Sequence, residues 1–190
     1  DDNITHIRNV TITGTVEVNS SLQLYVDQGG GPVLMDTISE QYIATGNWSY
    51  TFSLGQLAEG ANQITVIATD MADNVSAASS ALTVTLDTTM AQPGLPDLAA
   101  ESDTGDTGND EVTSDETPTF SGIADPDTHV TIRVDGEPIH TVDAGAAGAW
   151  TYTFAQGEIQ TGVHQIDVVA VDVAGNTSVP SDDLTIWLNV

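Results

Sequence analysis

The chain has 190 residues, with two Lys or Arg against 28 Asp or Glu and a formal net charge of −26. We expect it to bind neither nucleic acid nor anionic lipid, because both interactions depend on Lys and Arg. No apolar run approaches the roughly 18 residues that a membrane helix needs, and the absence of Cys excludes disulfide bridges. Charge of this size makes the folded chain repel itself. That repulsion must be screened by salt, relieved by bound cations, for which divalent ions are the most economical, or tolerated.

The sequence contains two copies of one unit. Four matches carry the repeat: DNIT (2–5) with DEVT (110–113), TITG (11–14) with TFSG (119–122), GNWSYTF (46–52) with GAWTYTF (148–154), and DMADN (70–74) with DVAGN (172–176). A period of roughly 100 residues indicates whole domains in series, because solenoid repeats are about 20 to 50 residues long. We therefore predict two domains, residues 1–86 and 87–190, with residues 87–96 as a linker.

One segment of the second copy has no counterpart in the first. Residues 96–100 (PDLAA) precede the repeated part of the second copy and are typical of a short first strand. The first domain is therefore expected to lack its first strand or to receive it from elsewhere.

Each copy alternates apolar and polar residues in short runs, a period of two that predicts half-buried β-strands. The apolar positions of the second copy are Val130, Ile132 and Val134; Trp150, Tyr152 and Phe154; Ile166, Val168 and Ala170; and Leu184, Ile186 and Leu188. Asp135-Gly136 lies between two runs and predicts a type I′ hairpin, because that turn needs positive φ at both positions. Short strands with turn residues every 8 to 12 residues or so predict an all-β, antiparallel sandwich for each copy.

The Trp residues divide into two kinds. Trp48 and Trp150 occupy equivalent positions and each begins an alternating aromatic run, so we expect them to anchor the cores and not to stack on sugars. Trp187 falls out of phase with the apolar positions around it and should face outward, where it could pack on a following domain or stack on a sugar ring. Arg8 and Arg133, the only basic residues, are expected to pair with nearby acids.

Several motifs taken together resemble the bacterial Ig-like repeats of giant biofilm and RTX-type adhesins. They are DTT (87–89), LAAESDTG (98–105), TPTFSG (117–122), GAW (148–150) and DVAGNTS (172–178), and the resemblance covers nearly all of the second copy and most of the first. It implies two tandem Ig-like antiparallel β-sandwich domains. It also implies a non-enzymatic extender on the bacterial cell surface, exported by type I secretion, with calcium at its junctions.

The same resemblance implies neighbouring Ig-like repeats in the same chain, no membrane insertion, a role in biofilm formation, and a glycan or host-surface ligand bound elsewhere in the full-length protein. The first copy departs from the pattern with Asp73, where the second has Gly175, and with a longer loop at residues 29–31. The first copy therefore matches the calcium-binding residues that the resemblance implies less fully than the second copy does.

The first candidate Ca²⁺ site lies at the junction between the domains. In a sandwich whose strands run A, B, C, C′, E, F, G, the loops after B, C′ and F lie at the end where the linker enters. The side chains expected to converge there are Asp87, Asp125, Asp127, Asp172 and Asn176. Calcium takes about six to eight oxygen ligands, and carboxylates from separate loops suit its loose geometry. The alternative is that these residues only form and cap turns.

The second candidate Ca²⁺ site is the acidic loop of residues 103–110, whose carboxylates are Asp103, Asp106 and Asp110. Residues 108–112 match half of an RTX calcium repeat, but one copy cannot build a stacked roll, and the spacing does not fit an EF-hand. A single ion folding this loop onto its own domain, or onto a following domain, is one interpretation. A mobile, solvated acidic loop is the other.

Nothing in the sequence supports catalysis, because it has no Gly-x-Ser-x-Gly elbow and no phosphate-binding Gly loop. We expect a calcium-stiffened stalk segment. Two alternatives stay open: a module in which Trp187 or the loop of residues 27–41 binds a glycan or a host protein, and an accessory domain of a secreted enzyme.

Overall fold

The computed structural model describes residues 2–39 and 43–190, and within them the chain consists of strands, turns and loops without a helix. It divides into two compact units, Asp1–Thr88 and Thr89–Val190. The predicted boundary follows Leu86, so the first unit extends slightly beyond it. In the described residues, no helical segment could cross a membrane.

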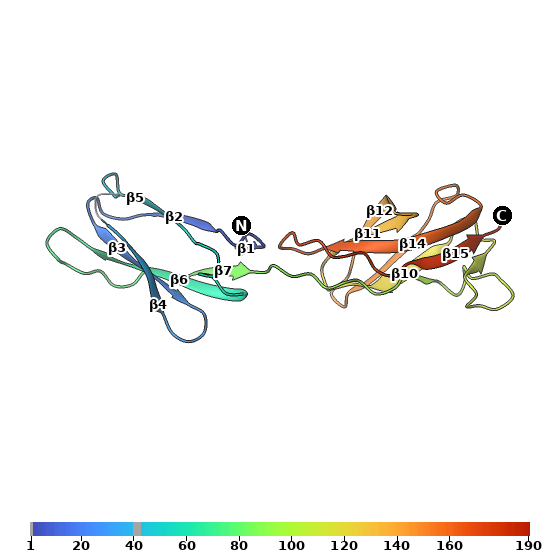
Figure 1. Ribbon diagram of the computed structural model, residues 1–190, viewed down its shortest axis with the longest axis horizontal. Helices are drawn as coiled ribbons and strands as arrows, with labels where there is room; N and C mark the ends of the chain where they lie inside the picture. The colour runs from blue at the N-terminus through green and yellow to red at the C-terminus, as the bar shows by residue number, and fades with distance from the viewer. Residues whose placement is uncertain (1, 40–42) are drawn as a thin grey trace. The chain divides into compact units, whose positions relative to one another are not determined.

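The described part of unit 1 holds seven strands (Figure 1). They are β1 (Ile4–Thr5), β2 (Thr11–Thr15), β3 (Ser21–Asp27), β4 (Val33–Ile38), β5 (Asn47–Thr51), β6 (Gly60–Thr69) and β7 (Leu82–Leu86). They form a five-stranded sheet in the order β1-β7-β6-β3-β4 and a two-stranded sheet of β2 and β5.

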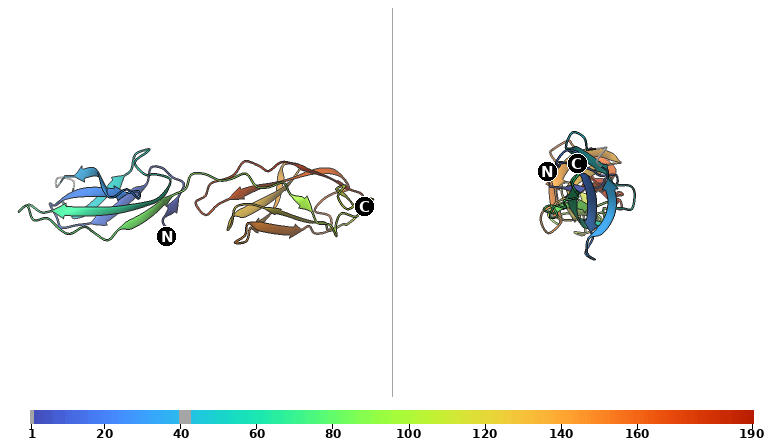
Figure 2. Two further views of the ribbon diagram at one scale, coloured as in Figure 1. Left: turned by 90° about the horizontal axis from the view of Figure 1, so that it is seen from below. Right: turned by 90° about the vertical axis from the view of Figure 1, so that its left-hand side faces the viewer.

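Unit 2 repeats this plan with one more strand. Its strands are β8 (Asp97–Leu98), β9 (Val112–Thr113), β10 (Thr119–Ile123), β11 (His129–Val134), β12 (Glu137–Asp143), β13 (Ala149–Thr153), β14 (Gly162–Val171) and β15 (Leu184–Leu188). They form a five-stranded sheet in the order β12-β11-β14-β15-β9 and a three-stranded sheet in the order β13-β10-β8. The predicted all-β sandwich is confirmed for both units, whose strands can be followed from two further directions in Figure 2.

The pairing is antiparallel with two exceptions, because β1 runs parallel to β7 and β9 runs parallel to β15. The predicted hairpin is confirmed: Asp135 and Gly136 have φ of 53° and 82°, and β11 pairs with β12 across them. The predicted first strand of unit 2 is shorter than residues 96–100, since the strand covers Asp97 and Leu98, although the Ala99 amide also donates to the Thr119 carbonyl of β10 over 2.9 Å.

Part of the predicted linker packs on unit 2. The Gly94 amide donates to the Ile123 carbonyl over 2.8 Å, and the Gln92 side chain donates to the Pro180 carbonyl over 2.8 Å. Met90 packs against the core of unit 2. Residues 90–94 therefore belong to the second unit and are not a free spacer.

Each unit has its own core between its sheets. In unit 2, Phe120 and Phe154 are fully buried and meet edge to face, with ring centroids 5.4 Å apart. Trp150 is 3% exposed, which confirms it as a core anchor. Its counterpart Trp48 is half-buried and packs against the core of unit 1, which Phe52 joins.

The longer loop predicted at residues 27–41 is wrong in part, because Val33–Ile38 forms β4 and pairs with β3 along its length. Residues 40 and 41 of that segment lie outside the described residues. Alternation along this stretch is weak, since Val33 and Leu34 are both exposed, and this hid the strand. The loop that joins β3 to β4 is the short Gly-rich turn of residues 28–32.

Candidate cation-binding site

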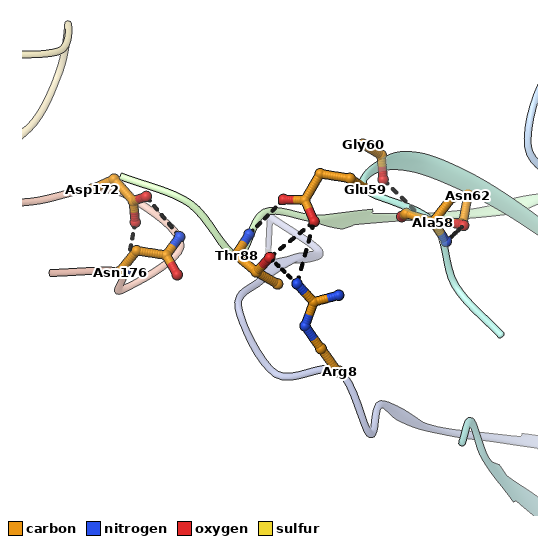
Figure 3. Close-up of polar contacts among 8 residues, drawn as sticks. All are labelled: Arg8, Ala58, Glu59, Gly60, Asn62, Thr88, Asp172 and Asn176. Carbon is orange, nitrogen blue, oxygen red and sulfur yellow. Dashed lines mark hydrogen bonds and ion pairs between the residues drawn. The ribbon is translucent and has the colours of Figure 1, made fainter. Parts of the chain in front are cut away.

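The loop after β14 uses its carboxylate to close a turn. Oδ1 of Asp172 accepts from the Asn176 amide over 2.8 Å, and Oδ2 accepts from the Asn176 side-chain nitrogen over 2.8 Å (Figure 3). Both side chains are half-buried. Asp70 and Asn74 make the same pair of contacts in unit 1, and the Asn74 bonds are the main reason that the pKa of Asp70 is lowered. The turn-capping role weighed for Asp172 is therefore observed in both copies.

The loop after β10 carries Asp125 and Asp127 on its surface. Oδ2 of Asp125 accepts from the Ala91 amide over 3.4 Å, and its carbonyl accepts from Thr128 Oγ1 over 2.8 Å. Asp127 has a φ of 58°, in the left-handed region that Asp tolerates better than most residues. Both side chains are exposed and available to a ligand.

Asp87 belongs to unit 1, where its amide donates to the Thr5 carbonyl over 3.0 Å. The next residue is held by Glu59, whose Oε1 and Oε2 accept from the amide and hydroxyl of Thr88 over 2.6 and 2.9 Å. Arg8 donates to the same hydroxyl and lies 3.9 Å from Glu59 Oε2 (Figure 3). The Thr88 amide bond is the main reason that the pKa of Glu59 is lowered. The pairing expected for Arg8 is confirmed.

The predicted junction set is thus divided, with Asp87 in unit 1 and its other four members in unit 2. Calcium binding by these five residues stays a prediction.

The acidic loop between β8 and β9 is packed onto its own unit. Asp103 is only 8% exposed, and its Oδ1 is buried without a hydrogen-bond partner. On either side, hydrogen bonds fasten the loop: Ser102 Oγ donates to Asp115 over 2.8 Å, and the Ser114 amide donates to Thr104 Oγ1 over 2.8 Å. A buried carboxylate oxygen without a donor is costly in an apolar setting, so this atom is the least satisfied feature of the loop.

Asp110 closes the other end of the loop. Its Oδ2 accepts from the Thr107 amide over 3.1 Å, and its Oδ1 accepts from the Val112 amide over 3.2 Å. The Thr107 amide is the main cause of the lowered pKa of Asp110. Gly105 lies against this carboxylate so closely that a Cβ there would be 2.2 Å from Oδ1. A side chain at position 105 would therefore push the Asp110 carboxylate away from the loop.

Two further carboxylates, those of Glu111 and Asp97, lie near Asp103 and Asp110. Glu111 has a second buried, unpartnered oxygen, Oε2. Burial raises the pKa of Glu111, and the negative charges of Asp103, Asp97 and Asp110 raise it further. We call Asp97, Asp103, Asp110 and Glu111 the acidic cluster. As they stand, no three His, Asp or Glu side chains among the described residues are gathered closely enough to hold one metal ion.

Asp106 lies beside the acidic cluster. It lines a surface hollow of about 380 Å³ together with Asp110, Trp187 and Asn189. Trp187 is 50% exposed, which confirms that it faces outward. The three residues predicted for the second site therefore lie in one loop next to an exposed indole ring, with Asp103 buried and Asp106 and Asp110 exposed.

Asp97 and Glu111 were not among the predicted ligands. A signal for Glu111 was present, because its counterpart in the repeat is Asn3, and both residues have positive φ, 59° and 58°. Asn tolerates the left-handed region, whereas Glu seldom adopts it. Glu111 therefore holds a backbone conformation that costs free energy, next to the buried Asp103.

The family model described as "Bacterial Ig-like domain" matches residues 1–88 and 89–187. Among solved structures, the chain is similar to one of a 1.5-MDa bacterial ice-binding adhesin, with 20% identity over 100% of this chain and 61% of that one and a TM-score of 0.50. It is also similar to a tetra-tandem repeat from the extending region of a large adhesion protein, with 20% identity, 99% and 47% coverage and a TM-score of 0.43. The chain spans about half the length of that structure. No curated protein matches the chain.

Proposed function

Because the chain belongs to the family of bacterial Ig-like domains, we propose that it is an extender segment of a large adhesin on the bacterial cell surface, stiffened by bound calcium. Two domains of the same family in direct succession suit a spacer, since each adds length without needing a site of its own. Such a segment would hold an adhesive tip away from the cell and so support biofilm formation.

The observation that carries the calcium proposal is the buried Oδ1 of Asp103, which has no hydrogen-bond partner. A second unpartnered oxygen on Glu111 and the charges of Asp97 and Asp110 act on the same place. Carboxylate oxygens are the ligands that calcium prefers, and these two oxygens have no other partner. Because the carboxylates are not gathered around one point as they stand, calcium would have to draw the acidic cluster together as it binds.

Calcium at this place would tie the loop to the strands on either side of it, because Asp97 begins β8 and Glu111 precedes β9. An ion that binds the folded state and not the unfolded chain raises stability in proportion to the logarithm of its concentration. It would also offset part of the self-repulsion of a chain with a net charge of −26. Stiffness would then follow the calcium concentration.

The binding test uses the full 190-residue chain and isothermal titration with CaCl₂. We expect saturable binding that falls by about tenfold or more in Asp103→Asn, because a ligand charge is lost. Glu137→Gln removes an exposed charge of the β12 strand and serves as the matched control. Equal affinity in the Asp103 and Glu137 variants would show that the acidic cluster is not the site.

Terbium luminescence gives a second readout, since Tb³⁺ replaces Ca²⁺ at oxygen sites and is excited through a nearby indole. Trp187 lines the hollow beside Asp110 and is the exposed Trp of unit 2. Trp187→Phe should lose the sensitised emission while titration calorimetry still records binding. Emission that survives in this variant would place the ion elsewhere.

Stiffening is tested by small-angle scattering of the full chain with calcium and with EDTA. Chelation should broaden the distribution of distances within the molecule and lower the melting temperature. The variants Asp125→Asn and Asp172→Asn address the junction set separately from the acidic cluster. Identical profiles with and without chelator would overturn the stiffening role, even if calcium binds.

A further inference from the structure

The two units differ in the pairing of one strand. In unit 2, β10 is paired on both sides: with β13 and with β8, where Leu98 lies opposite Phe120. The equivalent strand of unit 1, β2, pairs with β5 alone among the described residues. One edge of β2 is therefore open where its counterpart is covered.

The open edge has the backbone groups that a strand would need. Val10 and Val16 flank β2 and bond toward the β5 side, through Phe52 and Gly46. Since backbone groups alternate in direction along a strand, those of Thr11, Thr13 and Thr15 point to the open edge. Their counterparts in unit 2 include Thr119 and Ile123, whose carbonyls accept from Ala99 and Gly94 over 2.9 and 2.8 Å.

Beside the open edge lies a groove of about 490 Å³, lined by apolar side chains of β2 and β7 that include Ile12, Leu82 and Val84. Leu98 fills the matching place in unit 2, where it is 4% exposed and belongs to the core. The comparison of equivalent leucines shows the effect: Leu82 is 39% exposed, whereas Leu184 is 8% exposed. The groove of unit 1 thus has room for one apolar side chain.

We propose that the β2 edge and this groove are the docking site for an extended strand of the β8 kind, joined to the same polypeptide ahead of residue 1. Such a strand would pair antiparallel with Thr11–Thr15 and place one apolar side chain between Ile12 and Leu82. Unit 2 contains such a strand, β8, which pairs with β10 and belongs to the same chain. It precedes β9 in the sequence, just as the docked strand would precede β1. An open edge is otherwise free to pair with other chains.

The test fuses a second copy of residues 94–108 directly ahead of residue 1 of the full chain. Asp1 is the counterpart of Asn109, so the added Leu then lies as far before Ile12 as Leu98 lies before Phe120. The control fusion carries Asp instead of that Leu. Hydrogen exchange is read at the amides of Thr11, Thr13 and Thr15. We expect protection to rise on the order of tenfold and the unit 1 transition to rise by about 5 °C in the Leu fusion only.

Two results would overturn the proposal. The first is a Leu fusion in which these amides exchange as fast as in the parent chain, with its unit 1 transition unchanged. The second is a parent chain that dimerises as its concentration rises, with protection of the same amides, because a second copy would then cover the edge. The free peptide of residues 94–108, added in trans, should protect the amides only at high concentration.

Discussion

The indole ring of Trp150 lies directly against Gly122 on the neighbouring strand. A Cβ built on Gly122 would be 2.7 Å from Cζ2 and 2.8 Å from Cε2 of the ring. Gly14 and Trp48 repeat this relationship in unit 1, with a closest approach of 2.6 Å. The pair is thus a shared feature of the two sandwiches, in which glycine makes space for the Trp of the paired strand.

Gly122→Ala should destabilise unit 2 by about 1 to 3 kcal/mol, because the methyl group overpacks the core and the buried Trp150 has little room to move. Urea unfolding followed by Trp fluorescence measures the change. Gly108→Ala is the control, since nothing lies within 4 Å of a Cβ at that position. A Gly122→Ala variant as stable as the control would contradict the packing argument.

Arg133 and Asp167 form a paired contact between β11 and β14. Arg133 Nε donates to Asp167 Oδ1 over 2.8 Å, and Nη2 donates to Oδ2. Asp167 is 6% exposed, and its hydrogen bond is the main cause of the raised pKa of Arg133. Arg133→Met should cost about 2 to 4 kcal/mol, because a buried carboxylate then loses its partner.

The double variant Arg133→Met/Asp167→Leu distinguishes the stabilisation that comes from the ion pair from the cost of leaving one partner alone. It should be more stable than Arg133→Met alone, since no unpaired charge is left inside the sheet. Chemical unfolding of the single and double variants gives the coupling energy. Effects that simply add would mean that the two side chains do not stabilise each other.

Asp135 gives unit 2 a specific sensitivity to acid. Its pKa is lowered first by the Gln165 amide, which donates to Oδ1 over 2.9 Å, and then by His164, whose Nδ1 lies 2.7 Å from Oδ2. The unfolded chain, with an Asp pKa of about 3.9, takes up this proton before the folded chain does. The stabilisation is therefore complete above that pH and is lost as the pH falls through the lower folded pKa.

Asp135→Asn should flatten the loss of stability in acid, because the group that binds the proton is gone while Asn still tolerates the positive φ of the turn. Melting temperatures from about pH 5 to pH 2 measure it. Glu137→Gln, an exposed change in the same hairpin, should leave the slope as in the parent. The prediction fails if the Asn variant keeps the full slope.

Asp103→Asn should change stability in opposite directions with and without calcium. In EDTA the variant should melt at a higher temperature than the parent, because a buried carboxylate oxygen without a partner and the repulsion between Asp103 and Glu111 are removed. With calcium in excess it should melt at a lower temperature than the parent, because a ligand charge is missing and bound calcium stabilises the variant less. Paired melts in the two buffers show the reversal, and a variant that is less stable in both would count against it.

The strands could be predicted where burial alternates strictly. Along β11 and β15, period two in the sequence corresponds to the buried residues Val130 and Ile132 and to Leu184, Ile186 and Leu188. Asp135-Gly136 predicted its hairpin because few residues accept positive φ. The exposed β4 strand had no such signal.

The candidate site was less predictable. The loop sequence indicated Asp103 and Asp110 as possible ligands, because acidic residues and Gly residues alternate there within one short segment. Asp97 lies near enough to Glu111 to raise its pKa, although Asp97 belongs to β8 and Glu111 to the approach to β9, and these two strands lie in different sheets. Two-residue strands of this kind, including the parallel pairing of β9, depend on contacts distant in sequence, which no local pattern records.

The parallel pairing of the terminal strands has a mechanical consequence. In unit 1, β1 lies beside β7, with Ile4 opposite Thr85 and Thr5 opposite Leu86. Pulling the two ends of the unit apart drags these neighbours past each other lengthwise, so their hydrogen bonds bear the load together and are not peeled one by one. Glu59 holds Thr88, just after β7, through two hydrogen bonds. A pulling force on the chain is therefore resisted by these bonds and by the paired strands β1 and β7 before it acts on the core.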